Sequence, residues 1–455
     1  METVSTIIYF LITIGILVFV HELGHFLAAI SCGMRAEVFA LGMGNRVFGW
    51  NKVSGFNFGK LKPDLDLQGN TDYRVAAFPI GGYVKIAGMI DESLDTALDK
   101  NDIQPWEYRA KPVWQRMIVI SAGVIMNIFL AIGIFWGINY SQGESYMQTT
   151  EIGIVVANSP AEKSGLRVGD KIVSVNGKKM DYWEAIQASI YVDFLGSDIA
   201  LEIERGGVQQ IISIPRKNIP DPSSSETLFG IDAANTEAII SEVVSGKPAE
   251  KVGIQSGDVI LSINGFKVFN QEHVIKIVRA NSEKEITILI RRNSETKTFN
   301  VTPSSEGRIG IVVGRRYNGP IISKQYGLFE SFPRGVKQTV SVTTLYAHSI
   351  WQLIVGKADF AKSVGGPVKI AQMANRSAES GITSFLAFTA LLSISLAVMN
   401  ILPFPALDGG HLIVLIYEAI VRKPLPNIVQ IRIQQTGMAI LLAFMVFVLF
   451  NDIFG

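Results

Sequence analysis

Four apolar stretches constrain the fold of this chain more than any other feature of its sequence. They cover roughly residues 5–31, 115–140, 384–420 and 433–451, and each reaches the about 20 residues that a helix needs to cross a bilayer. Helices and closed barrels are the structures that satisfy every backbone hydrogen bond in lipid, so we expect four transmembrane helices. The composition, 48% hydrophobic and 18% charged, also leaves enough polar sequence for water-exposed domains, and the net charge of +1 gives no reason to expect nucleic acid binding.

The first apolar stretch contains three ionisable side chains, in the pentapeptide His21-Glu22-Leu23-Gly24-His25. In a helix, residues four apart share a face, so the two imidazoles can bind one metal ion while Glu22 acts beside them as a general base. An ionisable group inside a membrane helix costs at least ~2.5 kcal/mol, which favours a functional role over a pair of merely hydrogen-bonded histidines. Glu2 and the lack of Lys or Arg before this stretch argue against a cleaved signal peptide.

A catalytic zinc site takes three protein ligands and leaves one position for water, so another apolar stretch should supply the third ligand. The third stretch is too long for one simple span, and Pro403 and Pro405 break it. Asp408 follows at the start of its second half, where it can either bind the metal or cap the helix. His411, one turn further on, is the rival ligand or a supporting partner.

Glycine-rich sequence follows the first apolar stretch. Residues 40–59 and 74–87 favour turns and strands over helix. Such backbone lies at membrane depth only when it is buried in protein or lines a watery cavity. The two segments therefore predict either a membrane-associated β element near the metal or an ordinary cytoplasmic hairpin. The acidic sequence at 91–102 is expected to be a solvated loop, and Asn127 in the second stretch is expected to bond across helices.

The middle of the chain contains an internal repeat. Residues 160–177 recur as residues 248–265 at a constant offset. Each copy predicts a short helix ended by glycine, an apolar strand and an Asn-Gly turn, and a period of this length indicates duplicated globular domains. The pattern resembles the PDZ domains of bacterial envelope proteases, which add a peptide strand to a sheet edge. The alternative is that the two domains bind no peptide and serve only as a spacer or a shield.

Taken together, three features resemble the site-two protease family of intramembrane zinc metalloproteases. They are HExxH in a first transmembrane helix, Asn-x-x-Pro-x-Pro-x-Leu-Asp-Gly at 400–409 in a later one, and tandem PDZ-like domains between them. The resemblance implies that Zn2+ is the cofactor and that its ligands are His21, His25 and Asp408. It also implies that Glu22 is the catalytic base. It also implies substrate-binding roles at five further positions: Gly42, Gly44, Asn400, Pro403 and Pro405.

The resemblance implies cleavage of the transmembrane segments of single-span proteins, an anti-sigma factor and remnant signal peptides, in regulated intramembrane proteolysis of the envelope stress response. Lys and Arg near the span ends predict that the active site lies towards the cytoplasm and that the middle section faces the opposite compartment. The resemblance implies that the membrane is the bacterial inner membrane and that the PDZ-like domains are periplasmic. The rival classes are an intramembrane metal transporter or sensor and a PDZ scaffold with a non-catalytic metal site. The oligomeric state does not follow from the sequence.

The expected fold is a polytopic α-helical membrane protein with four transmembrane helices and a membrane-associated β element, plus two tandem PDZ-like α/β domains. Residues 1–140 are expected to hold the first two spans and the β segment, and residues 384–455 the last two spans with the third ligand. Between them we expect the PDZ-like domains at 141–225 and 226–305. Amphipathic membrane-surface helices are expected at 306–383.

Overall fold

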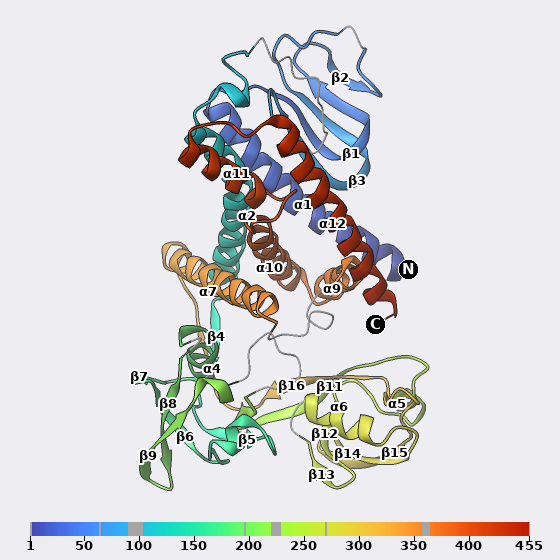
Figure 1. The fold of residues 1–455 in the computed structure, drawn as a ribbon. Coiled ribbons are helices and arrows are strands. Elements are labelled where there is room, and N and C mark those ends of the chain that lie inside the picture. The colour runs from blue at the N-terminus through green and yellow to red at the C-terminus, as the bar shows by residue number, and fades with distance from the viewer. Residues whose placement is uncertain are drawn as a thin grey trace. The chain divides into compact units, whose positions relative to one another are not determined.

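The computed structural model describes residues 2–62, 65–89, 103–194, 197–219, 229–268, 271–356 and 365–454. The acidic loop expected at 91–102 and the expected boundary between the two repeats lie outside these residues. The chain forms two compact units (Figure 1): Met1–Gly143 together with Gln325–Gly455, and Glu144–Lys324.

The first unit is mainly helical. Its helices are α1 (Glu2–Ser31), α2 (Val113–Gln142), α7 (Leu328–Ile354), α9 (Pro367–Glu379), α10 (Ile382–Asn400), α11 (Asp408–Val421) and α12 (Asn427–Phe454). Four of them, α1, α2, α10 and α12, are long and apolar enough to cross a membrane, which agrees with the four predicted spans. The long third stretch is divided into α10 and α11, because the two prolines between them cannot donate the backbone hydrogen bonds of a continuous helix.

Helix α2 lies at the centre of this unit and contacts α1, α7, α10 and α11 (Figure 1). Ala131 and Phe135 of α2 are buried against Ile394 of α10, and apolar residues of α7 pack onto the same cluster. At Gly335 the backbones of α7 and α2 approach so closely that a Cβ would lie 2.7 Å from the backbone nitrogen of Trp136. Part of the apolar surface of α7 therefore packs on α2 and α10, while other apolar side chains of α7, such as Val340 and Trp351, are exposed.

A three-stranded sheet follows α1, in the order β2-β1-β3. Its strands are β1 (Ala36–Asn51), β2 (Gly55–Phe58) and β3 (Asp72–Ile86). Both long strands bend, so that Leu41 pairs with Gly82 near the end of β3 while Phe48 pairs with Val75 near its start. At the bend of β1, Gly42 has φ 83°, and a Cβ there would lie 2.4 Å from the carbonyl oxygen of Phe78.

The second unit consists of strands and short helices. Its first copy contains β5 (Ile152–Val155), α3 (Pro160–Lys163), β6 (Lys171–Val175), β7 (Lys178–Lys179), α4 (Trp183–Ala188), β8 (Ile199–Arg205), β9 (Val208–Ile214) and β10 (Ile231–Ala233). Its second copy contains β11 (Thr236–Val243), α5 (Pro248–Lys251), β12 (Val259–Ile263), β13 (Phe266–Lys267), α6 (Gln271–Ala280), β14 (Ile286–Arg292), β15 (Glu295–Val301) and β16 (Ile311–Tyr317). Strands β4 (Glu144–Met147) and β17 (Ile321–Lys324) pair with each other.

The two copies of the repeat fold around separate apolar cores. Each copy contains an equivalent Arg–Asp ion pair. Arg205 Nε lies 2.6 Å from Asp170 Oδ1, and Arg292 Nε lies 2.6 Å from Asp258 Oδ1. In each copy the same guanidinium also donates to the carbonyl of the glycine that ends the short helix. The repeat in the sequence is thus a repeat of structure.

Candidate metal centre

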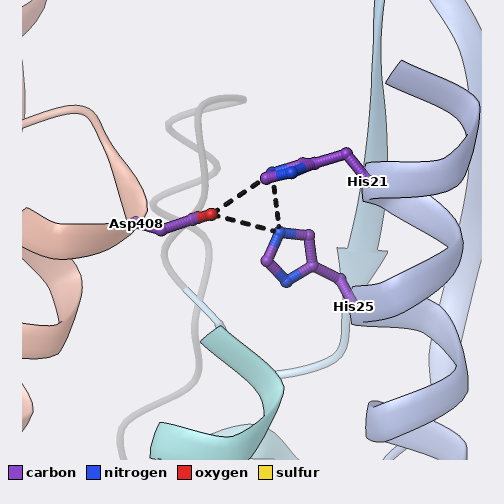
Figure 2. Close-up of side chains that lie close together, drawn as sticks. All are labelled: His21, His25 and Asp408. Atoms are coloured by element: carbon purple, nitrogen blue, oxygen red, sulfur yellow. Dashed lines mark hydrogen bonds and ion pairs between the residues drawn. The ribbon is translucent and has the colours of Figure 1, made fainter. Parts of the chain in front are cut away.

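Three side chains from two distant segments meet inside the first unit (Figure 2). His21 and His25 project from α1 towards Asp408 at the start of α11. Asp408 Oδ2 lies 3.2 Å from His21 Nε2 and 3.6 Å from His25 Nε2, and the two imidazole nitrogens are 3.2 Å apart. Within the described part of the chain, this is the group of three His, Cys, Asp or Glu side chains whose geometry can hold a metal ion.

The spacing of these three atoms fits zinc. A tetrahedral zinc with bonds of about 2.0–2.2 Å keeps its ligand atoms about 3.3–3.6 Å apart, close to the distances between these three atoms. Asp408 Oδ2 is also buried and receives no hydrogen bond from the described residues, although two imidazole nitrogens face it. Three lone-pair-bearing atoms directed at one point repel one another unless a cation lies between them. Two imidazoles and a carboxylate are a donor set of catalytic zinc sites.

Helix α2 contacts Nδ1 of both imidazoles, the ring nitrogen that does not face Asp408. His25 Nδ1 lies 2.8 Å from the carbonyl oxygen of Val119, and His21 Nδ1 lies 3.1 Å from Asn127 Nδ2. Asn127 therefore bonds across helices, as predicted. Gly123 lies between these contacts, and a Cβ there would be 2.5 Å from His25 Nε2. Gly123 was not predicted from the sequence; the available signal was its position one helical turn before Asn127, on the same face of α2.

A compact turn places Asp408. Helix α10 ends at Asn400, and Ala406 adopts a left-handed conformation with φ 74°. Leu407, rather than Asp408, is the N-cap of α11, and it makes no side-chain capping bond. Gly409 packs so tightly on the turn that a Cβ would lie 2.1 Å from the carbonyl oxygen of Leu402. The Asp408 carboxylate is consequently directed at the histidines instead of capping its own helix.

His411, the rival ligand in the sequence, lies outside the group of three. Its Nε2 lies 2.9 Å from Nε2 of Gln434 in α12. The described contacts therefore connect His411 with α12, whereas Asp408 faces α1.

Glu22 lies on α1, and its side chain faces β3. A Cβ on Gly82 of β3 would lie 3.2 Å from Glu22 Cγ. Glu22 directly follows His21 on α1, so its carboxylate belongs to the same helical turn as the proposed ligands. A half-buried carboxylate in this position can exchange a proton with a group held at the centre.

The five other predicted site residues are distributed over two regions. Asn400 reaches the centre, since its Nδ2 lies 3.4 Å from His21 Nε2. Pro403 lies in the turn between α10 and α11, and Pro405 packs against α12, where a Cβ on Gly437 would lie 2.4 Å from the Pro405 carbonyl oxygen. Gly42 and Gly44 lie at the bend of β1, and their nearest neighbours belong to β3 rather than to the three-residue group.

Comparisons with known proteins agree with this chemistry. The model of peptidase family M50 matches residues 9–444. The chain is 30% identical to a Vibrio cholerae protein named "Putative zinc metalloprotease", over 98% of this chain and 97% of the relative. It is also 30% identical to the "Regulator of sigma E protease" of Haemophilus influenzae, and 29% identical to the "Protease RseP" of Yersinia pestis, each over 97% of both chains. Since the family model spans nearly the whole sequence, the chain belongs to peptidase family M50, the site-two proteases, and is a zinc-dependent metalloendopeptidase of the membrane.

Proposed function

We propose that this protein is an intramembrane endopeptidase that cleaves the transmembrane segments of single-span membrane proteins. In this proposal His21, His25 and Asp408 hold the catalytic zinc and Glu22 is the general base. The observation that carries it is the meeting of the three ligand atoms at 3.2–3.6 Å between α1, a helix long enough to span a bilayer, and α11. A hydrolytic centre between such helices is suited to a substrate that lies in the membrane.

The reaction needs a water made nucleophilic in an apolar setting. Zinc, when bound, is a Lewis acid that polarises a carbonyl and lowers the pKa of a water towards ~7. Glu22 accepts the proton from the attacking water, holds it on its carboxylate and delivers it to the leaving amine. Asn400, near His21 at the end of α10, is placed to hydrogen-bond the substrate carbonyl beside the scissile bond.

The substrate must be extended before it can react, because the peptide bonds of a helix are shielded by their own hydrogen bonds. The end of β3 around Gly82 lies beside Glu22. A substrate strand added to this edge would pass the catalytic carboxylate. In this proposal the bend at Gly42 and Gly44 shapes the sheet, and the turn with Pro403 and Pro405 forms the opposite wall of the substrate site.

The second unit supports a role in substrate selection. Its two copies share the sequence pattern of PDZ domains, and we propose that the pair is PDZ-like and acts as a size filter in the periplasm, with the active site towards the cytoplasmic side of the inner membrane. The Haemophilus influenzae relative is named "Regulator of sigma E protease". By that similarity the proposed substrates are an anti-sigma factor, after its external domain has been removed, and remnant signal peptides.

The substitution Glu22→Gln tests this function. We expect purified Glu22→Gln protein to keep its zinc, because no ligand is changed, and to lose at least 100-fold in cleavage of a model transmembrane helix, within the range for general acid–base catalysis. A metal transporter or sensor has no need of Glu22, so loss of cleavage with zinc retained would exclude that class. Normal cleavage of the model helix by this variant would refute Glu22 as the base. Unchanged turnover after His21→Ala would instead favour a scaffold with a non-catalytic site.

A further inference from the structure

Asn127 of α2 is fully buried directly behind His21. Its side-chain nitrogen Nδ2 lies 3.1 Å from His21 Nδ1, and none of its surface is accessible. Its backbone carbonyl accepts a hydrogen bond of 2.7 Å from Ser393 Oγ of α10, which fixes this part of α2. The amide therefore contacts the Nδ1 edge of the His21 ring, whereas Nε2 of the same ring faces Asp408.

The chemistry of imidazole decides which atom of Asn127 should face His21. A neutral imidazole carries one N–H and one lone pair. If His21 Nε2 offers its lone pair to a metal, as proposed above, Nδ1 carries the proton and needs an acceptor. His25 shows the same requirement already met, since the carbonyl oxygen of Val119 lies 2.8 Å from its Nδ1.

The Asn127 amide has an unused acceptor. Among the described residues its Oδ1 is buried without a hydrogen-bond partner, while Nδ2, a donor, faces Nδ1. A half-turn of the amide exchanges the two atoms at nearly the same positions. The oxygen then accepts the Nδ1 proton of His21.

We infer that Asn127 is a positioning residue whose amide oxygen accepts the Nδ1 proton of His21 and so keeps Nε2 of that ring directed at the metal. Val119 lies two turns earlier on α2 and contacts Nδ1 of His25 in the same way. The two residues of α2 thus leave Nε2 of both imidazoles directed at the metal. Outer partners of this kind commonly change metal affinity by about 10–100-fold. The inference rests on the proposed ligand role of His21 and adds the residue that sets its tautomer.

Zinc affinity of the purified full chain, measured by competition with a chelator at pH 8, tests the inference without reference to cleavage. We expect Asn127→Leu, which has similar volume and no acceptor, to bind zinc about 10–100-fold more weakly. Asn127→Asp should bind zinc within threefold of the wild-type protein or more tightly, because an ionised carboxylate accepts the same proton. Asn139→Leu is the matched control: Asn139 is a buried amide on the same helix that bonds Phe135 and Gln338, and its loss should leave zinc affinity unchanged.

The outcomes separate this inference from the proposed function. If Asn127→Asp binds zinc tenfold or more weakly, the amide acts as a donor to Nδ1 and the inference is wrong. It is equally wrong if Asn127→Leu folds and binds zinc within twofold of the wild type, or if Asn139→Leu loses as much affinity. Should His21→Ala leave zinc affinity unchanged, the proposed ligand set itself is refuted.

Discussion

Gly123 of α2 leaves no room for a side chain beside the metal centre. A methyl group there would lie 2.5 Å from His25 Nε2 and 2.8 Å from His21 Nε2, both well inside contact distance. We expect Gly123→Ala to displace an imidazole and reduce cleavage of a reconstituted transmembrane substrate about 100-fold, since misplacement of 1 Å has costs of that order. Zinc content of the same sample should fall with it.

Gly133→Ala is the control for this prediction. Gly133 lies on the same helix, and a methyl group added there would have no described atom within 4 Å, so the substitution should leave cleavage unchanged and stabilise α2 by about 0.5–1 kcal/mol. Wild-type cleavage and zinc content in Gly123→Ala would show that the helix can shift and that the close approach is unimportant.

The sequence revealed some of these residues and concealed others for a physical reason. His21, Glu22 and His25 follow from helical periodicity, which is local, and Asp408 follows from a broken apolar stretch. Gly123 is an ordinary small residue of a membrane helix, and its importance arises only when α2 packs against α1. Contacts between distant segments depend on how the helices dock, which no local pattern encodes.

At the scale of elements, α2 packs against both α1 and α11, the two helices that carry the proposed ligands, but contributes no ligand itself. Arg116 of α2 pairs with Glu418 of α11 at 3.0 Å, and the Glu418 carboxylate is almost completely buried. We expect the pair to couple by about 1–3 kcal/mol in a double-mutant cycle of Arg116→Gln and Glu418→Gln. The measurement is equilibrium unfolding of the purified protein in mixed detergent micelles.

The exposed pair Lys297–Glu295 is the control for that cycle. Its side chains are 42% and 75% exposed, so its coupling should be close to zero. A coupling below about 0.5 kcal/mol for Arg116 and Glu418 would mean that α11 is held in place by packing alone.

The ion pair between Asp170 and Arg205 gives the first copy of the repeat a predictable response to acid. Burial disfavours the charge of Asp170, but the Arg205 guanidinium and the backbone N–H of Arg167 outweigh it, so the pKa of Asp170 lies below its usual range. The ionised carboxylate therefore stabilises the folded state above about pH 4, the range of an unfolded aspartate, and this contribution is lost as pH falls through the lower folded pKa.

Asp170→Asn should accordingly lower the melting temperature at pH 7, and the difference from the wild type should narrow as the pH is lowered from about 4 to 3. Scanning calorimetry of the purified full chain across this range measures both quantities. Asp181→Asn, in an exposed pair with Lys179, should change neither. A constant difference at every pH would assign the effect of Asp170→Asn to lost packing.

Elements were predictable where one segment determines its own structure. The four spans follow from length and apolarity, and the repeat follows from its turn residues. The bent sheet did not follow, because the pairing of β1 with both ends of β3 depends on contacts between strands. The packing of α7 on α2 and α10 did not follow either, since an amphipathic pattern does not identify the helices that its apolar residues contact.

At the scale of the whole molecule, the chain combines a membrane-embedded unit that contains the candidate zinc centre with a duplicated unit rich in strands. Each unit has its own buried cores. The central claim is that α1 and α11, whose ligands lie nearly four hundred residues apart in sequence, complete one zinc site within the first unit.

X-ray absorption at the zinc edge of the purified full chain tests this claim most directly. We predict one zinc per chain, bound by two imidazole nitrogens and by oxygen at about 2.0–2.2 Å, and loss of that zinc in Asp408→Ala. A sulfur ligand, or a zinc whose spectrum is unchanged in Asp408→Ala, would contradict the claim.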